Sequence, residues 1–243
     1  MPDSWFVAML EFSLDVYNIR ILLAIGMLVT ASILDFWKRE IHDLLWIIFA
    51  VAAVLLLFFE PSISNTLIVI AISMIIAPLS IVMWRIGIFG GADAFCLIVL
   101  AALVPMVTLS NSTTTPFTTI ANAAILSLIP LFANVVRNTI AILHHKDIFD
   151  GFDETKLKKT CAMFLGHRSV NPKYSFSIEK LEDGQKKLNF SLHHAENADF
   201  CNTKDTWVTP GIPYILYIAG GFLIQLFFGD LFLNVFGNFF IMR

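Results

Sequence analysis

Long apolar stretches alternate with short polar ones along most of the chain, and their lengths match the thickness of a lipid bilayer. A helix needs about 20 apolar residues to cross the hydrocarbon core. Proline is tolerated inside such a helix because neighbouring helices can satisfy the freed backbone groups. The pattern therefore predicts a mainly α-helical, polytopic membrane protein with six transmembrane helices, at about Ile19–Phe36, Leu44–Phe59, Thr66–Trp84, Ile88–Leu109, Phe117–Leu143 and Ile212–Phe236.

One polar stretch, residues 146–209, separates the fifth and sixth predicted spans, and we call it the polar segment. It holds ten of the 16 basic and ten of the 19 acidic residues of the chain. Apolar and polar residues alternate over Tyr174–Ile178 and Leu188–Leu192, on either side of Glu182-Asp183-Gly184-Gln185. Two alternating runs around an Asp-Gly turn predict a β-hairpin. We therefore expect five membrane helices in residues 1–145, a small cytoplasmic α+β or β domain in 146–209, and the sixth helix in 210–243.

Composition supports the membrane assignment and excludes several other classes of protein. The 243 residues are 57% hydrophobic and 14% charged, whereas a soluble domain has about 45–50% apolar and about 25% charged residues. The net charge of −3 offers no polycation for a nucleic acid. The cysteines Cys96, Cys161 and Cys201 stand far apart without a CxxC pair. We expect a lipid bilayer as surroundings, and neither a nucleic-acid partner, a metal nor a cofactor.

The basic residues predict the orientation of the helices. Of the 16, 14 fall on one side of the predicted spans, in the first, third and fifth loops and at the end of the fifth span. Basic loops stay on the cytoplasmic side of a membrane. The sequence therefore predicts an N-terminus outside, a polar segment in the cytoplasm and a C-terminus outside.

Two aspartates, Asp35 and Asp93, lie near the cytoplasmic ends of the first and fourth predicted spans. An ionisable residue within a membrane span is costly and is a functional candidate by default. Each also has a plainer interpretation. Asp35 precedes Lys38 and Arg39 and can form an interfacial salt bridge, and Asp93 can be an acid favoured by the dipole at a helix N-terminus. From the residues alone, both interpretations remain open.

Two short motifs around these aspartates resemble those of a known family. The stretch Asp35-Phe-Trp-Lys-Arg-Glu-Ile-His-Asp43 and the stretch Gly90-Gly91-Ala92-Asp93 are similar to the aspartate motifs of archaeal preflagellin and prepilin peptidases, which are GxGD-type intramembrane aspartyl proteases. Members of this family have six spans, with catalytic aspartates on the first and fourth. The resemblance implies that Asp35 and Asp93 are catalytic and that Gly90, Gly91 and Ala92 support them. Ala92 replaces the second glycine of a strict GxGD, as is common in the archaeal branch.

The resemblance also implies an activity and a substrate. It points to an aspartic endopeptidase that removes short basic leader peptides from archaellin or type IV pilin-like precursors at the cytoplasmic membrane face, without a cofactor. Glu40 and Asp43 can attract such a leader, although they can equally belong to a solvated loop. An alternative is a proton- or cation-coupled transporter subunit that uses Asp35 and Asp93. Transporter sites usually lie near the midplane between repeats, and no repeat is visible here. A third possibility is a structural membrane protein in which both aspartates are replaceable.

Overall fold

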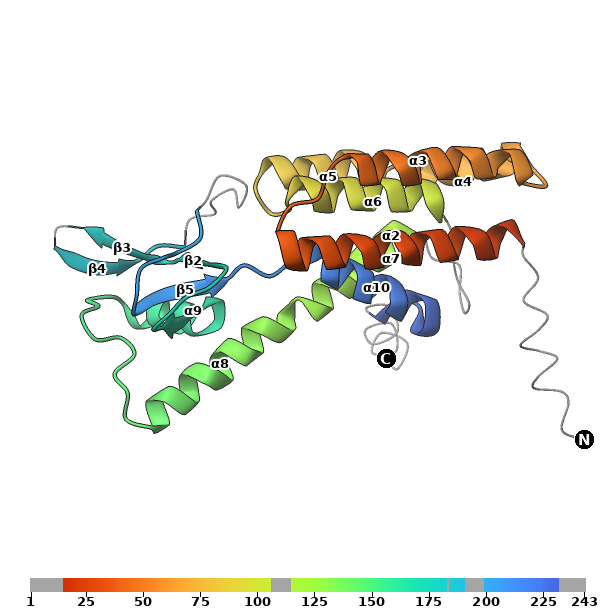
Figure 1. Ribbon diagram of the computed structural model, residues 1–243. Coiled ribbons are helices and arrows are strands. Elements are labelled where there is room, and N and C mark those ends of the chain that lie inside the picture. The colour runs from red at the N-terminus through yellow and green to blue at the C-terminus, as the bar shows by residue number, and fades with distance from the viewer. Residues whose placement is uncertain (1–14, 106–114, 183, 191–198, 232–243) are drawn as a thin grey trace, which may run out of the picture.

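The computed structural model describes residues 15–105, 115–182, 184–190 and 199–231, and its helices follow the predicted apolar stretches (Figure 1). The first two are α2 (Val16–Lys38) and α3 (Leu44–Leu56), the second extended by a 3-10 turn over Leu57–Phe59. The fourth and sixth predicted spans correspond to α6 (Gly91–Leu103) and α10 (Tyr214–Phe228). Their predicted ends, near Leu109 and Phe236, lie outside the described residues.

The third and fifth predicted spans are each divided into two helices. The third consists of α4 (Ile63–Ser73) and α5 (Ile76–Arg85), and the fifth of α7 (Thr115–Leu126) and α8 (Leu128–Leu143). Pro78 and Pro130 each lie a few residues after the break. A proline inside a helix lacks the N–H that would bond four residues back, and its ring clashes there. Proline therefore explains both interruptions.

Three helical stretches within the described residues are long and apolar enough to cross a membrane. They are Val16–Lys38, Ile63–Arg85 and Thr115–Leu143. Three further apolar helices are shorter, with the bounds Leu44–Phe59, Gly91–Leu103 and Tyr214–Phe228. The protein is thus a mainly helical membrane protein with three membrane-capable helices, and six spans remain a prediction.

The polar segment folds into the helix α9 (Lys156–Leu165) and two small antiparallel sheets. One sheet has the order β1-β5-β2, formed by His167–Ser169, Thr206–Pro210 and Ser175–Ser177, and the other pairs β3 (Glu179–Glu182) with β4 (Gln185–Leu188). The predicted turn does join β3 and β4. The predicted pairing of the Tyr174–Ile178 run is only partly correct. Ile178 O accepts from Asn189 N–H of the second run, but β2 pairs with β5 instead. The two strands of the hairpin are mostly charged, so apolar alternation does not mark them.

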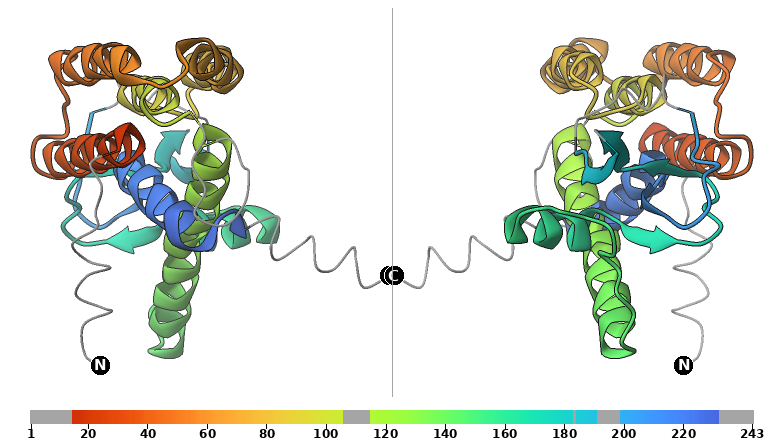
Figure 2. Two further views of the ribbon diagram at one scale, coloured as in Figure 1. Left: turned by 90° about the vertical axis from the view of Figure 1, so that its right-hand side faces the viewer. Right: turned by 90° about the vertical axis from the view of Figure 1, so that its left-hand side faces the viewer.

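Helix α6 lies at the centre of the membrane helices and packs against α2, α3, α4, α5, α7 and α10 (Figure 2). Its residues Leu97, Leu100 and Leu103 are fully buried. The polar segment lies beyond the end of the bundle at which α2 ends and α6 begins (Figure 1). Asp35 lies on the last turn of α2, and Asp93 lies on the first turn of α6. The fold thereby brings both aspartates to the boundary between the membrane helices and the polar segment.

Candidate active site

A cavity of about 640 Å³ opens at this boundary. Its walls come from the end of α2, the beginning of α3, the connection between α5 and α6, the polar segment, and the residues that lead into α10. The candidate residues singled out from the sequence all line it: Asp35, Glu40, Asp43, Gly90, Gly91, Ala92 and Asp93. The structure therefore collects in one place residues that the sequence could only place on the same side of the bundle.

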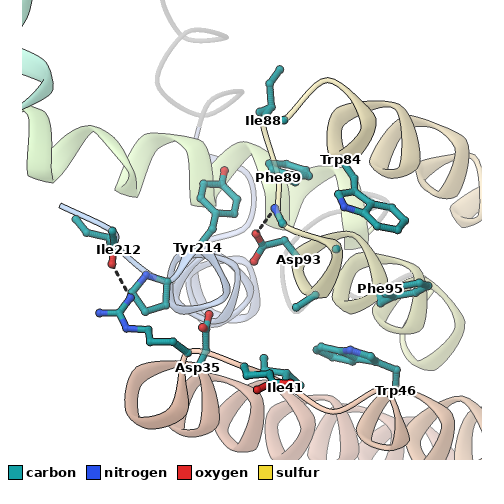
Figure 3. Close-up of a pocket in the computed structure, with 18 of the residues that line it drawn as sticks. Asp35, Ile41, Trp46, Trp84, Ile88, Phe89, Asp93, Phe95, Ile212 and Tyr214 are labelled. Atoms are coloured by element: carbon teal, nitrogen blue, oxygen red, sulfur yellow. Dashed lines mark hydrogen bonds between the residues drawn. The ribbon is translucent and has the colours of Figure 1, made fainter. Parts of the chain in front are cut away.

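The two aspartates enter this cavity from different helices. Asp35 is half-buried on the last turn of α2, and Asp93 is 8% exposed on the first turn of α6. Figure 3 shows both carboxylates directed into the space between α2, α6 and α10, with the ring of Tyr214 beside them. The two carboxylates therefore face one cavity from two different helices.

Gly90 helps to position the carboxylate of Asp93. The backbone N–H of Gly90 donates a hydrogen bond of 3.0 Å to Asp93 Oδ2 (Figure 3). A β-carbon at position 90 would lie 3.3 Å from the same oxygen. The interpretation of Asp93 as an N-terminal acid of its helix is therefore correct, but the same carboxylate also borders the cavity. Capping of this kind fixes the side chain in one orientation, which a catalytic group requires.

The salt bridge that the sequence allows at Asp35 is not formed in the described part of the chain. Among the described residues, Asp35 forms no ion pair with Lys38 or Arg39. Arg39 ends α2 in the left-handed conformation with φ of 58°, and its backbone N–H donates to Asp35 O at 3.1 Å. Its guanidinium donates to the carbonyl of Gly211 and lies 5.0 Å from the ring centroid of Tyr174.

The cavity combines negative charge with aromatic surface. Its charged lining residues in the described chain are four acids and Arg39, so the lining is net negative. Glu40 and Asp43 are exposed on the short connection between α2 and α3. The aromatic lining residues are Trp46, Trp84, Phe89, Phe95, Phe176, Phe200 and Tyr214. Sequence reasoning missed Phe176, Phe200 and Tyr214, because they come from the polar segment and from α10, and no motif marks them.

Such an arrangement can hydrolyse a peptide bond. Two carboxylates directed at one substrate can divide the work, one ionised and acting as a base on water, the other protonated and acting as an acid. An open cavity at the end of the bundle admits the water that hydrolysis consumes. Among the described residues, no group of three or more His, Cys, Asp or Glu side chains is placed to hold a metal ion.

Comparison with known proteins yields two adjoining family matches. Residues 22–132 match the type IV leader peptidase family, and residues 131–231 match the model described as archaeal peptidase A24 C-terminus type II. A preflagellin peptidase of Methanococcus maripaludis is 30% identical over 85% of this chain and 93% of its own length. A preflagellin peptidase of Methanocaldococcus jannaschii is 27% identical over 88% and 97%, respectively. The corresponding protein of Methanococcus voltae is 29% identical over 87% and 97%.

Proposed function

The chain belongs to the type IV leader peptidase family, and on this premise we propose that Asp35 and Asp93 are its catalytic pair and that its substrates are archaellin or type IV pilin-like precursors. The observation that carries the assignment is the shared cavity, in which side chains from α2 and α6 face one space. Membership in a peptidase family favours this activity over a transporter. The named substrates of the similar proteins, preflagellins, suggest the precursor class.

The chemistry follows from two carboxylates that hold one proton between them. The ionised carboxylate removes a proton from water as the water oxygen attacks the carbonyl carbon of the scissile bond. The protonated carboxylate donates its proton to the carbonyl oxygen. When the tetrahedral intermediate collapses, the C–N bond breaks and the amine leaves with the proton that the base had taken. One hydroxyl of the intermediate returns its proton to the other carboxylate as the C=O bond re-forms, which restores the starting pair. Because the proton is shared, the two roles belong to the pair rather than to either residue.

We also propose a topology for this reaction. All six apolar helices cross the membrane, the N-terminus is outside, and the cavity opens toward the cytoplasm. The distribution of basic residues supports this orientation, because Lys38, Arg39 and ten basic residues of the polar segment gather at the same end of the bundle as the cavity. Cleavage then releases the leader on the cytoplasmic side.

The decisive experiment replaces each aspartate separately. Membranes that contain the protein are mixed with a precursor carrying a basic leader, and the shortened product is measured. Asp35→Asn and Asp93→Asn are each expected to lower the rate about 10²- to 10⁴-fold. Asp153→Asn is the matched control, because this exposed aspartate of the polar segment does not line the cavity. Near-normal cleavage by either active-site variant, at equal protein level, would overturn the assignment.

Glu40 and Asp43 have a separate role in the proposal, as attractive charges for the basic leader. Both are exposed at the cavity, where an opposite charge on the substrate is favoured at low salt. The double variant Glu40→Lys, Asp43→Lys is expected to raise KM for a basic-leader precursor and to weaken the salt dependence of cleavage. A precursor with a neutral leader provides the control. Unchanged cleavage of the basic-leader precursor by the double variant would remove this role.

A further inference from the structure

The polar segment contributes an aromatic wall to the cavity that holds the aspartates. Phe176, on β2, and Phe200 both line this cavity. Their rings stack with centroids 5.2 Å apart and an angle of 29° between planes. Both side chains are half-buried rather than enclosed. The polar segment therefore forms part of the site and is more than a connection between α8 and α10.

A glycine allows this wall to lie directly against the backbone that leads into α10. The N–H of Gly211 donates to Tyr174 O at 2.9 Å. A β-carbon at position 211 would lie 2.9 Å from that oxygen, 3.0 Å from Phe176 Cε2 and 3.4 Å from Phe200 Cε1. Because real β-carbons do not approach backbone oxygen so closely, a side chain here would displace the aromatic pair. The position of the pair is thus fixed by direct backbone contact.

Arg39 links the same wall to the turn that carries Asp35. Its backbone N–H bonds to Asp35 O, and its Nη1 donates to the carbonyl of Gly211. Its guanidinium lies over the Tyr174 ring, and Tyr174 meets Phe200 edge to face at 5.6 Å and 89°. A continuous series of contacts therefore runs from Asp35 through Arg39 and Tyr174 to Phe200.

We propose that Phe176 and Phe200 form a subsite that takes an apolar side chain of the precursor next to the scissile bond, and that Arg39 is the positioning residue that holds this subsite relative to Asp35. The proposal rests on the proposed function. Half-exposed aromatic rings in an open cavity gain free energy when an apolar side chain covers them. The carboxylates of the same cavity suit the basic part of the precursor. The two classes of lining residue therefore match a substrate in which charged and apolar parts adjoin.

The first test measures substrate preference. Precursors with leucine or alanine at each position that flanks the scissile bond are cleaved by the wild type, Phe176→Ala and Phe200→Ala. The wild type is expected to prefer leucine over alanine at one position by about tenfold or more in kcat/KM. Each variant is expected to reduce this preference to within a few-fold, chiefly by raising KM for the leucine precursor. Phe164→Ala is the control, because this exposed phenylalanine of α9 does not line the cavity.

Two outcomes overturn the subsite. One is an unchanged preference in both variants, and the other is an equal loss of cleavage for every precursor, which indicates a purely structural role. These results are distinguishable from failure of the proposed function. The latter shows as cleavage that survives Asp35→Asn or Asp93→Asn, whereas the subsite is tested only by differences between precursors that the wild type cuts.

The second test addresses Arg39 as a positioning residue. Arg39→Met is expected to reduce the leucine preference as the phenylalanine variants do, and Arg39→Lys is expected to restore part of it, because lysine can still reach the Gly211 carbonyl and lie over Tyr174. Arg39→Met combined with Tyr174→Leu is expected to be scarcely worse than either change alone, because the contacts form one series. A retained preference in Arg39→Met, or full additivity of the two changes, contradicts the positioning role.

Discussion

Polar side chains of apolar helices occur in two places, at the interface between α7 and α10 and in the cavity between α2, α6 and the polar segment. At the interface they are enclosed by hydrogen-bond partners, whereas in the cavity they face an open space. At the α7–α10 interface, Thr119 Oγ1 donates to Gln225 Oε1 at 2.6 Å and Gln225 Nε2 donates to Thr115 Oγ1 at 3.2 Å. Gln225 is fully buried. In the cavity, Asp35 and Asp93 border an open volume of about 640 Å³. Polar residues enclosed by partners hold helices together, whereas polar residues that face a space can meet a substrate.

Glycine also lets the backbones of α7 and α10 approach each other closely. A β-carbon at Gly221 would lie 2.5 Å from Thr119 O and 2.7 Å from Ala123 N. Small residues of this kind let two helix backbones pack directly in a membrane. We therefore expect substitutions at this close-packed interface to affect stability, and substitutions in the cavity to affect cleavage.

The largest effect on stability is expected from Gly221→Leu. The new side chain would overlap the backbone of α7, so we expect a loss of about 3 kcal/mol or failure to fold. Gly26→Leu is the matched control, since no atom lies within 4 Å of a β-carbon at that position in α2. Thermal unfolding in detergent measures both. Equal unfolding temperatures for the two variants would show that the close packing of α7 against α10 does not determine stability.

Acid should destabilise the polar segment, which carries Phe176 and Phe200, before it affects the α7–α10 interface. Burial, reinforced by the nearby Arg137, lowers the pKa of His167 to about 4 from its ordinary 6.5. As pH falls from 6.5 toward 4, the unfolded chain binds the proton first, so the stability of the polar segment falls, by up to about 2 kcal/mol at pH 5. Hydrogen exchange of the β1 and β5 amides at pH 7 and pH 5 measures this.

Two variants make the pH test specific. His167→Gln should remove most of the change between pH 6.5 and 5, whereas His144→Gln, at an exposed site, should leave it intact. Glutamates with a lowered pKa, such as Glu179, cause a loss of stability mainly when the pH falls below their ordinary pKa of 4.5. If the α7–α10 amides lost protection first, the proposed order of opening would be wrong.

A smaller effect is expected from Gln225→Leu. It removes two hydrogen bonds to threonine hydroxyls inside the α7–α10 interface. Because interhelical hydrogen bonds in membranes contribute only about 0.6 kcal/mol each on average, the loss of stability should be about 1 kcal/mol. The unfolding temperature measures it, and cleavage per folded molecule should be unchanged. A large loss of cleavage in fully folded protein would mean that the interface also takes part in catalysis.

A small effect, on kcat and not on stability, is expected from Gly90→Ala. The added β-carbon would lie 3.3 Å from Asp93 Oδ2, so the carboxylate must shift by a few tenths of an ångström. A displacement of this size in a catalytic group should lower kcat a few-fold to about tenfold while the unfolding temperature stays constant. Steady-state cleavage and thermal unfolding of the same sample separate the two. A fall in stability without a change in kcat would assign Gly90 to the fold alone.

The sequence identified Asp35 and Asp93 as candidate functional residues because charges are scarce in the apolar helices. It also located the α2 and α3 stretches closely, since a sustained apolar run is a strong signal. It could not show the shared cavity, which depends on how α6 packs against α2. It also gave no sign that Arg20 is buried, pairs with Glu60 and donates to Leu103 O. Contacts between residues so distant along the chain leave no local pattern.

Cleavage and stability measured on one purified Asp93→Asn protein decide whether Asp93 is catalytic. Asparagine keeps the size of the side chain and can still accept the hydrogen bond from the Gly90 N–H. We predict an unfolding temperature within a few degrees of the wild type and a cleavage rate for a basic-leader precursor that is about 10²-fold lower or more. A folded Asp93→Asn protein that cleaves at the wild-type rate would contradict it.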